Sequence, residues 1–351
     1  MTLSILDETD QKLLNLMQTE VPLVERPYAE LGRKLGVDEA EVLRRVKALK
    51  TGQGEKRGLI RQISAIFDSK SLGYQSTLVA ARIAEDHLEA AAAIIGKHPG
   101  VSHNYQRTHS FNLWYTLAVP PDSRLGLEKT VEALHQMSGA ISTRMMPTLK
   151  LFKIGVRFDL TGDAEAVAAP VYSEANRTRG EGTALTEREK RLIRVLQQDL
   201  PVEGEAYAGW AKEAGMNVGE LLDAARHFAA QGMMRRFSAV LRHREAGISA
   251  NAMGVWVVPP EKQESFGATA AGFSAVSHCY LRQSYPDWPY TIFTMVHAPT
   301  QEQCQRVIGE IAEVTGIRDH AMLYSTREFK KVRVKYFLDD AAKWEREFLG
   351  K

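Results

Sequence analysis

The sequence reads VSHNYQR at residues 101–107 and VSHCYLR at residues 276–282. Five of the seven residues are identical, and His, Tyr and Arg occupy alternate positions in both stretches. Alternate side chains of a β-strand share one face of the sheet. We therefore expect a duplicated chain in which each copy presents an imidazole, a phenol and a guanidinium on one sheet face.

The duplication extends outward from these two stretches through most of the chain. Residues 6–14, LDETDQKLL, return at an offset of 179 as residues 185–193, LTEREKRLI. Further matches keep the same order, with offsets between 174 and 179. Residues 161–184, between the copies, are rich in Ala, Gly, Glu and Thr and lack an apolar period. This composition predicts a flexible linker.

Each copy divides into a helical part and a mixed part. Residues 7–18, 28–35 and 39–50 fit three helices, with a glycine-containing turn before the third. This pattern is typical of a winged helix-turn-helix, and residues 58–67 fit its wing. The segments that follow predict strand and helix in the ferredoxin-like βαββαβ order; in the first copy they are 75–84, 87–96, 101–108, 111–119, 125–137 and 143–158. The second copy repeats them at 252–258, around Phe266, and at 278–282, 290–297, 301–315 and 321–336.

The predicted fold class is therefore α+β, a tandem duplicate of a winged helix-turn-helix and a ferredoxin-like domain. The expected domains are a helix-turn-helix at 1–60, a ferredoxin-like domain at 61–160, the linker at 161–184, a second helix-turn-helix at 185–234 and a second ferredoxin-like domain at 235–351.

Composition restricts the class of protein further. The 351 residues include 45 Lys and Arg against 43 Asp and Glu, so net charge gives no reason to expect a nucleic-acid partner. Cys279 and Cys304 are too few for a disulfide framework or a thiolate zinc site. The acidic start of the sequence is unlike a signal peptide, and no run of about 18 apolar residues predicts a membrane helix. We expect a cytoplasmic protein without a membrane partner.

The order of domains resembles the Lrp/AsnC family of regulators, and that resemblance implies DNA binding by the third helix. Local charge argues against this alternative. Residues 1–50 contain 8 Lys and Arg against 9 Asp and Glu, and the second candidate recognition helix reads GELLDAARHFAA. Such a helix neutralises few phosphates and carries few side chains that read bases. We expect no specific nucleic-acid binding.

The strand motifs predict a pocket for a flat molecule that carries carboxylates. Arginine recognises carboxylates, histidine exchanges protons near neutral pH, and aromatic faces suit a conjugated ring. The same alternation places His109 on the face of His103. We expect the pocket to be shaped by Tyr105, His109, Trp114, Tyr280 and Trp288. The sequence contains no glycine-rich phosphate loop and no metal-binding motif, so we predict no metal site.

Longer strings carry a second resemblance. RQISAIFD at 61–68, GVSHNYQR at 100–107 and FNLWYTL at 111–117 resemble one subunit of the siroheme decarboxylases. MRRFSAVL at 234–241, VSHCYLR at 276–282 and STREFKK at 325–331 resemble its partner subunit. The chain thus resembles the fused form of this family, an Lrp/AsnC-like group.

The resemblance implies a carboxy-lyase of heme d1 or alternative heme biosynthesis. It implies removal of CO2 from the acetate groups at ring positions 12 and 18 of siroheme, giving 12,18-didecarboxysiroheme, with no dedicated cofactor. The partners would be siroheme and its product, and the two halves would pack as a pseudo-heterodimer, with a further homo-oligomer left open.

Roles for individual residues follow from the chemistry of losing CO2. Such a reaction needs a proton donor near the ring and a cationic anchor. We assign His103 and His278 as candidate general acids, and Arg107 and Arg282 as carboxylate anchors. Lys153, near the end of the first copy, is a further candidate for steering carboxylates. The sequence leaves open which copy is catalytic and whether a histidine ligates the substrate iron.

Overall fold

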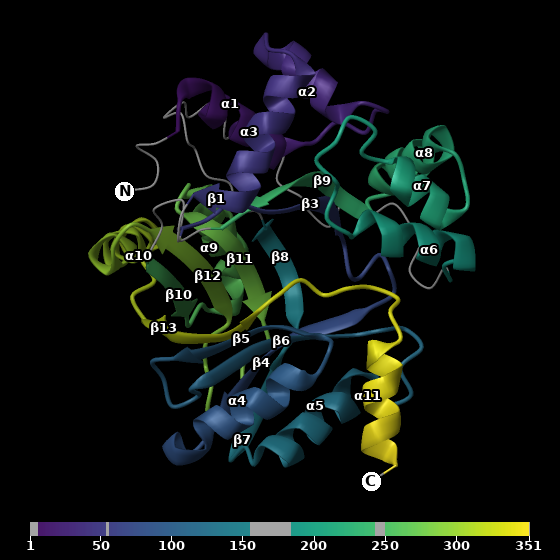
Figure 1. Ribbon diagram of the computed structural model, residues 1–351. Helices are drawn as coiled ribbons and strands as arrows, with labels where there is room; N and C mark the ends of the chain where they lie inside the picture. Colours follow the sequence, from purple (N-terminus) through teal and green to yellow (C-terminus); the bar gives the residue numbers. More distant parts are fainter. Residues whose placement is uncertain (1–5, 54–55, 155–183, 243–249, 351) are drawn as a thin grey trace. The chain divides into compact units, whose positions relative to one another are not determined.

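The computed structural model describes residues 6–53, 56–154, 184–242 and 250–350 (Figure 1). The chain forms two compact units, and neither is one half of the sequence. Unit 1 comprises Met1–Leu72 and Val156–Ser249, and unit 2 comprises Gly73–Gly155 and Ala250–Lys351. Each unit therefore contains the corresponding part of both copies. The expected linker at 161–184 lies, except for Ala184, outside the described residues.

Unit 1 contains the two predicted helix-turn-helix motifs. Aspartate and asparagine side chains cap their third helices, with Asp38 accepting from the backbone of Glu41 at 2.8 Å. Gly36 and Gly215 end the second helices in the left-handed conformation that favours glycine. The helices are α1 (Glu8–Thr19), α2 (Pro27–Leu35) and α3 (Glu39–Thr51) in the first copy, and α6 (Glu187–Leu196), α7 (Ala208–Ala214) and α8 (Val218–Ala230) in the second.

The prediction that residues 58–67 form a wing is wrong. Two antiparallel strands of two residues each, β1 (Gly52–Gln53) and β2 (Lys56–Arg57), follow α3 instead. Strand β3 (Ile60–Phe67) pairs antiparallel with β9 (Met234–Leu241) of the second copy. Both strands belong to unit 1, although they were expected at the start of the ferredoxin-like domains. Most of their apolar side chains are buried, and the local sequence does not reveal that the two strands pair with each other.

Two reciprocal hydrogen bonds reinforce the pairing of the copies in unit 1. The hydroxyl of Tyr28 donates to the carbonyl of Pro201 at 2.9 Å, and the hydroxyl of Tyr207 donates to the carbonyl of Pro22 at 3.2 Å. Both tyrosine rings are fully buried. The helix-turn-helix motifs thus use equivalent residues to hold each other.

Unit 2 is built on one sheet, whose strands follow the order β7-β4-β6-β5-β13-β10-β12-β11-β8 among the described residues. The first copy contributes β4 (Gln75–Arg82), the 3-10 helix η2 (Glu85–His87), α4 (Leu88–Lys97), β5 (Val101–Arg107), β6 (Leu113–Val119), α5 (Gly126–Ser138), β7 (Ser142–Met146) and β8 (Thr148–Ile154). The second contributes β10 (Ala250–Trp256), the 3-10 helix η5 (Pro260–Lys262), α9 (Gln263–Gly272), β11 (Val276–Arg282), β12 (Ile292–Ala298), α10 (Gln301–Thr315), β13 (His320–Lys331) and α11 (Asp340–Leu349). The predicted α+β class and the βαββαβ order are confirmed.

The last strand of each copy is shared with the other copy. In the first copy, β7 pairs with β4, and after Pro147 the chain continues as β8 beside β11. In the second, the first part of β13 pairs with β10 and the remainder with β5. Each copy thereby completes the sheet of its partner.

The strands of unit 2 have two different faces. One face packs on helices: Val79 and Leu117 of the first copy share a buried cluster with Ile95 of α4. The opposite face, called here the inner face, contains residues of both copies: Ala80, Trp114, Met253, Val255, Phe293 and Leu323 form one buried cluster. The copies therefore share a hydrophobic core on the inner face.

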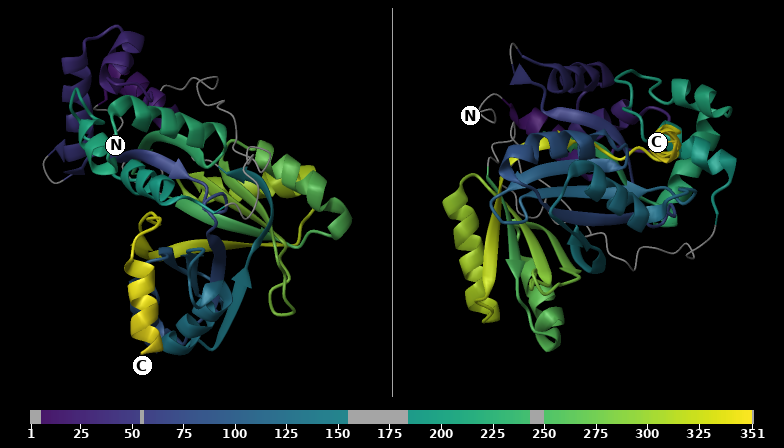
Figure 2. Two further views of the ribbon diagram at one scale, coloured as in Figure 1. Left: turned by 90° about the vertical axis from the view of Figure 1, so that its right-hand side faces the viewer. Right: turned by 90° about the horizontal axis from the view of Figure 1, so that it is seen from below.

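Helix α11 was not predicted, and it belongs to the second copy but packs on the first. The ring of Trp344 lies 4.4 Å from that of His98. The buried carboxylate of Glu345 accepts from the backbone of Arg124 at 3.0 Å and from the Ser123 hydroxyl. Figures 1 and 2 show this C-terminal helix beside α5. None of the described helices combines the length and apolar character needed to cross a membrane.

Candidate functional site

The first motif lies on β5 as expected. His103 and Tyr105 are level with Thr116 and Trp114 of β6, so they lie on the inner face. Asn104 points the other way and donates to the carbonyl of Ala92 in α4. The Ser102 hydroxyl lies 2.9 Å from Nδ1 of His103, whose ring stacks on Tyr105 at 6.0 Å. The alternation therefore brings imidazole and phenol together on one face.

Arg107 ends this row in a buried position. Its side chain is only 8% exposed, and its Nη1 donates to the carbonyl of Leu323 in β13 at 3.2 Å. Its Nε is buried and has no hydrogen-bond partner among the described residues. The guanidinium lies 5.8 Å from the ring centre of Tyr105, and burial lowers its pKa to about 10. Arg107 remains a cation at neutral pH.

The second motif repeats this geometry on β11. The Ser277 hydroxyl lies 2.8 Å from Nδ1 of His278, whose ring stacks on Tyr280 at 5.9 Å. Arg282 is also 8% exposed and donates to the carbonyl of Met146 at 2.5 Å. Its Nε is likewise unpaired among the described residues. The duplication thus preserves both the residues and their environment on the strand itself.

The structure corrects the expectation for three aromatic residues. Strand β5 ends at Arg107, so His109 lies in a turn, where its Nδ1 accepts from the backbone of Phe111. Burial lowers the pKa of His109, and its ring packs 4.9 Å from that of Trp288. Trp288 has no exposed surface and Trp114 is 2% exposed, with their rings 5.0 Å apart. The two tryptophans fill the shared core and have almost no surface that a ligand could contact.

Lys153 is also placed differently from the expectation. Its Nζ donates to the carbonyl of Phe273 at the end of α9, at 2.9 Å. In the pairing of β8 with β11 it lies level with Cys279, which packs in the core beneath α9. It therefore belongs to the helix-covered face, opposite His278 and Tyr280, and does not join the residues of the motif.

Four polar residues near the first motif were missed by the sequence reasoning. Asn251, His297, Ser325 and Lys331 lie on β10, β12 and β13 of the second copy. Burial, together with the positive charges of Lys331 and Arg107, lowers the pKa of His297 to about 4. The sequence does contain an indication for His297: it continues the series of alternate residues Phe293 and Met295, and so lies on the same face of the strand. Only the exchange of β13 brings these residues to the first motif.

The described residues contain no group of three or more His, Cys, Asp or Glu side chains placed to hold a metal ion. The residues of each motif that share the inner face are a histidine, a tyrosine and a buried arginine.

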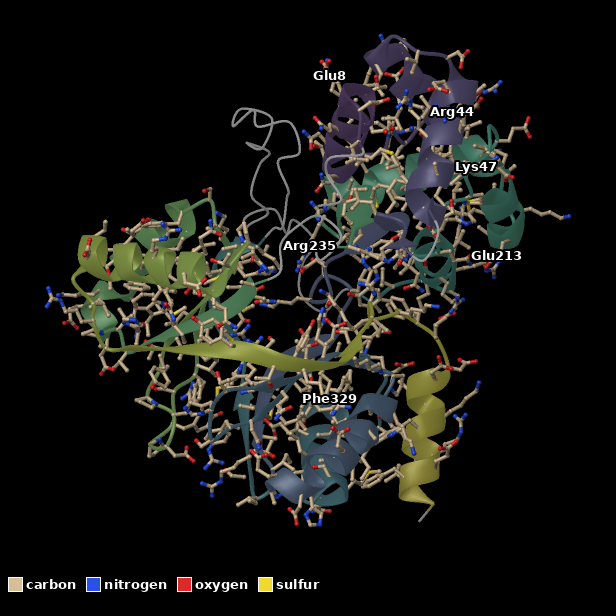
Figure 3. All side chains as sticks on the ribbon, turned by 60° about the vertical axis from the view of Figure 1, so that its left-hand side comes forward. Glu8, Arg44, Lys47, Glu213, Arg235 and Phe329 are labelled. Atoms are coloured by element: carbon tan, nitrogen blue, oxygen red, sulfur yellow. The ribbon has the colours of Figure 1, made fainter. Side chains whose placement is uncertain are left out.

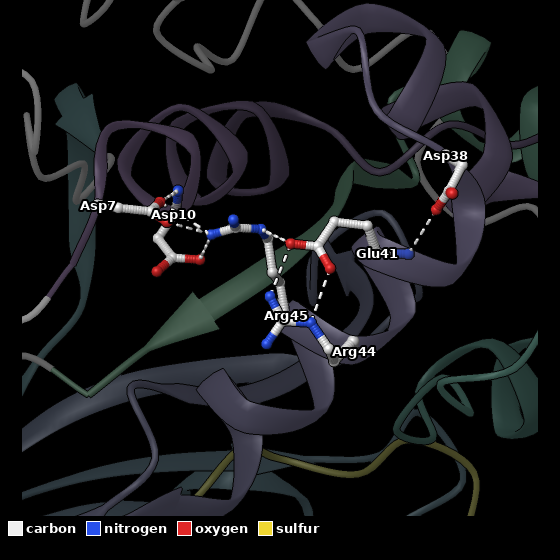
Figure 4. A network of polar contacts seen from close by, with 6 residues as sticks. All are labelled: Asp7, Asp10, Asp38, Glu41, Arg44 and Arg45. Carbon is white, nitrogen blue, oxygen red and sulfur yellow. Dashed lines mark hydrogen bonds and ion pairs between the residues drawn. The ribbon is translucent and has the colours of Figure 1, made fainter.

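The two arginines of α3, by contrast, are engaged within unit 1 (Figure 4). Arg45 contacts Asp7, Asp10 and Glu41 at 2.7–2.8 Å. Arg44 pairs with Glu41 at 2.6 Å, and these arginines lower the pKa of Glu41 to about 2. Glu8 and Lys47, labelled with Arg44 in Figure 3, belong to the same helix-turn-helix. Carboxylates thus already occupy the guanidinium groups that a phosphate would need.

Comparison with known proteins also distinguishes the helix-turn-helix parts of the chain from the ferredoxin-like parts. A family model described as AsnC-like ligand binding domain matches residues 71–153 and 245–330. Another, described as siroheme decarboxylase NirDL-like HTH domain, matches residues 10–61 and 189–235. The siroheme decarboxylase of Hydrogenobacter thermophilus is 38% identical over 341 residues, covering 97% of this chain and 98% of the relative.

The chain belongs to the siroheme decarboxylase family. A crystal structure of the siroheme decarboxylase NirDL has 34% identity and a TM-score of 0.76, covering 98% of this chain and 99% of the other. A structure of NirDL in complex with an iron-uroporphyrin III analogue covers the same shares, with 33% identity and a TM-score of 0.75. The resemblance to the siroheme decarboxylases drawn from the sequence is confirmed.

Proposed function

We propose that this chain decarboxylates siroheme at the acetate groups of ring positions 12 and 18, giving 12,18-didecarboxysiroheme. One observation carries the proposal: each repeated motif contains a buried guanidinium, Arg107 or Arg282, whose Nε lacks a partner among the described residues. A buried cation without an anion is costly, whereas a substrate carboxylate would stabilise it. The full-length relatives named above support the same substrate.

The chemistry requires a proton and an electron sink. Protonation of the adjacent ring carbon makes the pyrrole electron-poor, the bond between the acetate carbons breaks, and its electron pair forms an exocyclic methylene as CO2 leaves. The methylene carbon then takes a proton and the ring carbon loses one, leaving a methyl group. The net reaction for each acetate is R–CH2–CO2⁻ + H⁺ → R–CH3 + CO2, and no oxidant or reductant is consumed.

The motif residues match these needs. His103 and His278 are the candidate proton donors, since imidazole exchanges protons near neutral pH. Arg107 and Arg282 would anchor carboxylates, and Tyr105 and Tyr280 would offer a surface to the macrocycle. Because proton transfer suffices, the reaction runs without a separate cofactor, and the iron is part of the substrate. The fused halves act as one pseudo-heterodimer, and the enzyme works in the cytoplasm.

The test is turnover under anaerobic, reducing conditions. Purified protein incubated with siroheme should give a product lighter by two CO2 units, measured by mass spectrometry. A boiled sample is the control for spontaneous loss. Recovery of unchanged siroheme from folded protein would rule out the decarboxylase.

The regulator alternative makes an opposite prediction for DNA. Since Arg44 and Arg45 are paired with carboxylates, we expect no sequence-specific binding at physiological salt. Footprinting against promoter fragments measures this directly. A protected site that withstands competitor DNA would restore the regulator.

A further inference from the structure

The two motif strands have different neighbours, although the motifs themselves are alike. The register of β13 along β5 and of β8 along β11 identifies the side chains that share the inner face with each motif. Beside Arg107, Tyr105 and His103 these are Ser325, Glu328 and Lys331; beside Arg282, Tyr280 and His278 they are Thr148, Leu151 and Ile154. The first neighbourhood is polar and charged, and the second is mostly apolar.

A row of polar residues continues from Arg107 across the second copy. Ser325 is level with Arg107, and one step from the Ala252–Tyr324 pair places Asn251 level with Ser325. Asn251 is in turn paired with His297. His297, Asn251, Ser325 and Arg107 thus form one level row across β12, β10, β13 and β5, called here the polar row.

The equivalent row of residues, which runs from Arg282 of the second motif, is less polar. Tyr105 pairs with Trp114 and Tyr280 with Phe293, so Ala118 occupies the position of His297. Ser76, paired with Ala118, is exposed, and Thr148 already accepts from Arg282 at 3.2 Å. The second row therefore offers a ligand little beyond Arg282 itself.

Unsatisfied atoms in the polar row point to a missing ligand. Nε of Arg107, Oδ1 of Asn251 and Oγ of Ser325 are buried and have no hydrogen-bond partner among the described residues. Leaving such a group unpaired in the interior destabilises the folded protein. Three such groups from three adjacent strands of one face are expected where a polar ligand completes the hydrogen bonds.

The charges indicate which kind of ligand. The positive charges of Lys331 and Arg107 both contribute to lowering the pKa of His297, and the register places Lys331 level with His103. With a pKa of about 4, His297 is neutral at pH 7 and offers a hydrogen bond without adding positive charge. Lys331 and Arg107 give this face two cations against the one carboxylate of Glu328, and with a neutral imidazole and a hydroxyl they suit a carboxylate ligand. Asn251 donates to such a ligand when its amide nitrogen, in place of Oδ1, faces it.

We propose that the polar row and Lys331 bind a carboxylate of the tetrapyrrole beside His103. The motif on β5 is then the reaction site, and the motif on β11 has a structural role. The inference rests on the proposed function and deepens it. It assigns three residues of the second copy, Asn251, His297 and Lys331, to substrate binding at the motif of the first.

The experiment is an anaerobic absorbance titration of the full chain with iron-uroporphyrin III. We expect one porphyrin per chain. Lys331→Met and Asn251→Leu should each weaken binding about tenfold or more, as expected for loss of a charged hydrogen bond. Lys150→Met removes the same charge from β8, where Lys150 pairs with Glu264, and Ser76→Ala alters the position equivalent to Asn251. Both controls should stay within about twofold of wild type.

His297→Gln keeps a neutral hydrogen-bonding group and provides a milder variant if Asn251→Leu does not fold. It should weaken binding less than His297→Leu. Two porphyrins bound with equal affinity, or unchanged binding in all variants of the polar row, would overturn the inference. If wild type converts siroheme while these variants bind normally, only the inference fails. If folded wild type neither binds porphyrin nor converts siroheme, the proposed function fails with it.

Discussion

Replacing His103 with Ala should slow single-turnover decarboxylation of siroheme by roughly 10²–10⁴-fold, the usual contribution of a positioned acid or base. Siroheme binding should persist, because Arg107 and the polar row are unchanged. The hydroxyl of Ser102 at Nδ1 and the ring of Tyr105 hold the imidazole in place on the inner face. Rapid mixing followed by quenching and mass analysis measures the rate, and absorbance measures binding.

His278→Ala is the matched comparison, because Ser277 and Tyr280 hold that ring in the same way. We expect a smaller loss, since the neighbours of His278 are mostly apolar. Near-wild-type rates in both variants would show that the motif histidines are structural. Equal large losses would contradict the inequality of the two faces.

Replacing Trp288 with Ala should lower the free energy of unfolding by about 3–5 kcal/mol, the range for a large aromatic residue removed from a core. Trp288 is fully buried, and its ring contacts those of His109, Phe111 and Trp114. These contacts join the two copies in unit 2, so the cavity opens in their shared core. Denaturant unfolding followed by circular dichroism provides the measurement.

Leu149→Ala serves as the control for this variant. Leu149 lies on β8 and is 55% exposed, so its removal should change stability by no more than about 0.5 kcal/mol. Trp288→Phe should recover part of the loss by refilling the cavity. A loss below about 1 kcal/mol in Trp288→Ala would mean that the site collapses around the missing ring.

Features that depend on local patterns were predictable from the sequence. The alternation of His103, Tyr105 and Arg107 predicted their common face, and the glycine at position 36 marked the end of α2. Such signals arise within one element, because side-chain period and capping depend on nearby residues. The duplication then transferred each assignment from one copy to the other.

Features that depend on long-range pairing were not predictable in this way. Nothing within β3 indicates that its partner is β9, and nothing within β13 shows that it continues from β10 to β5. Asn251 and His297 were therefore missed as neighbours of the first motif. Trp114 and Trp288 were assigned to a pocket because aromatic residues near a polar motif suit either a ligand or a core. Their burial favours the core.

The exchange of terminal strands bears on how a duplicated chain can specialise. A substitution in β12 or β13 of the second copy alters the surroundings of the motif on β5 of the first. Selection for chemistry at the first motif can therefore change the sequence of the second copy. We therefore expect that replacing either half by its counterpart from a relative disturbs both. Covalent fusion keeps such co-adapted halves at high effective concentration and passes them on as one inherited pair.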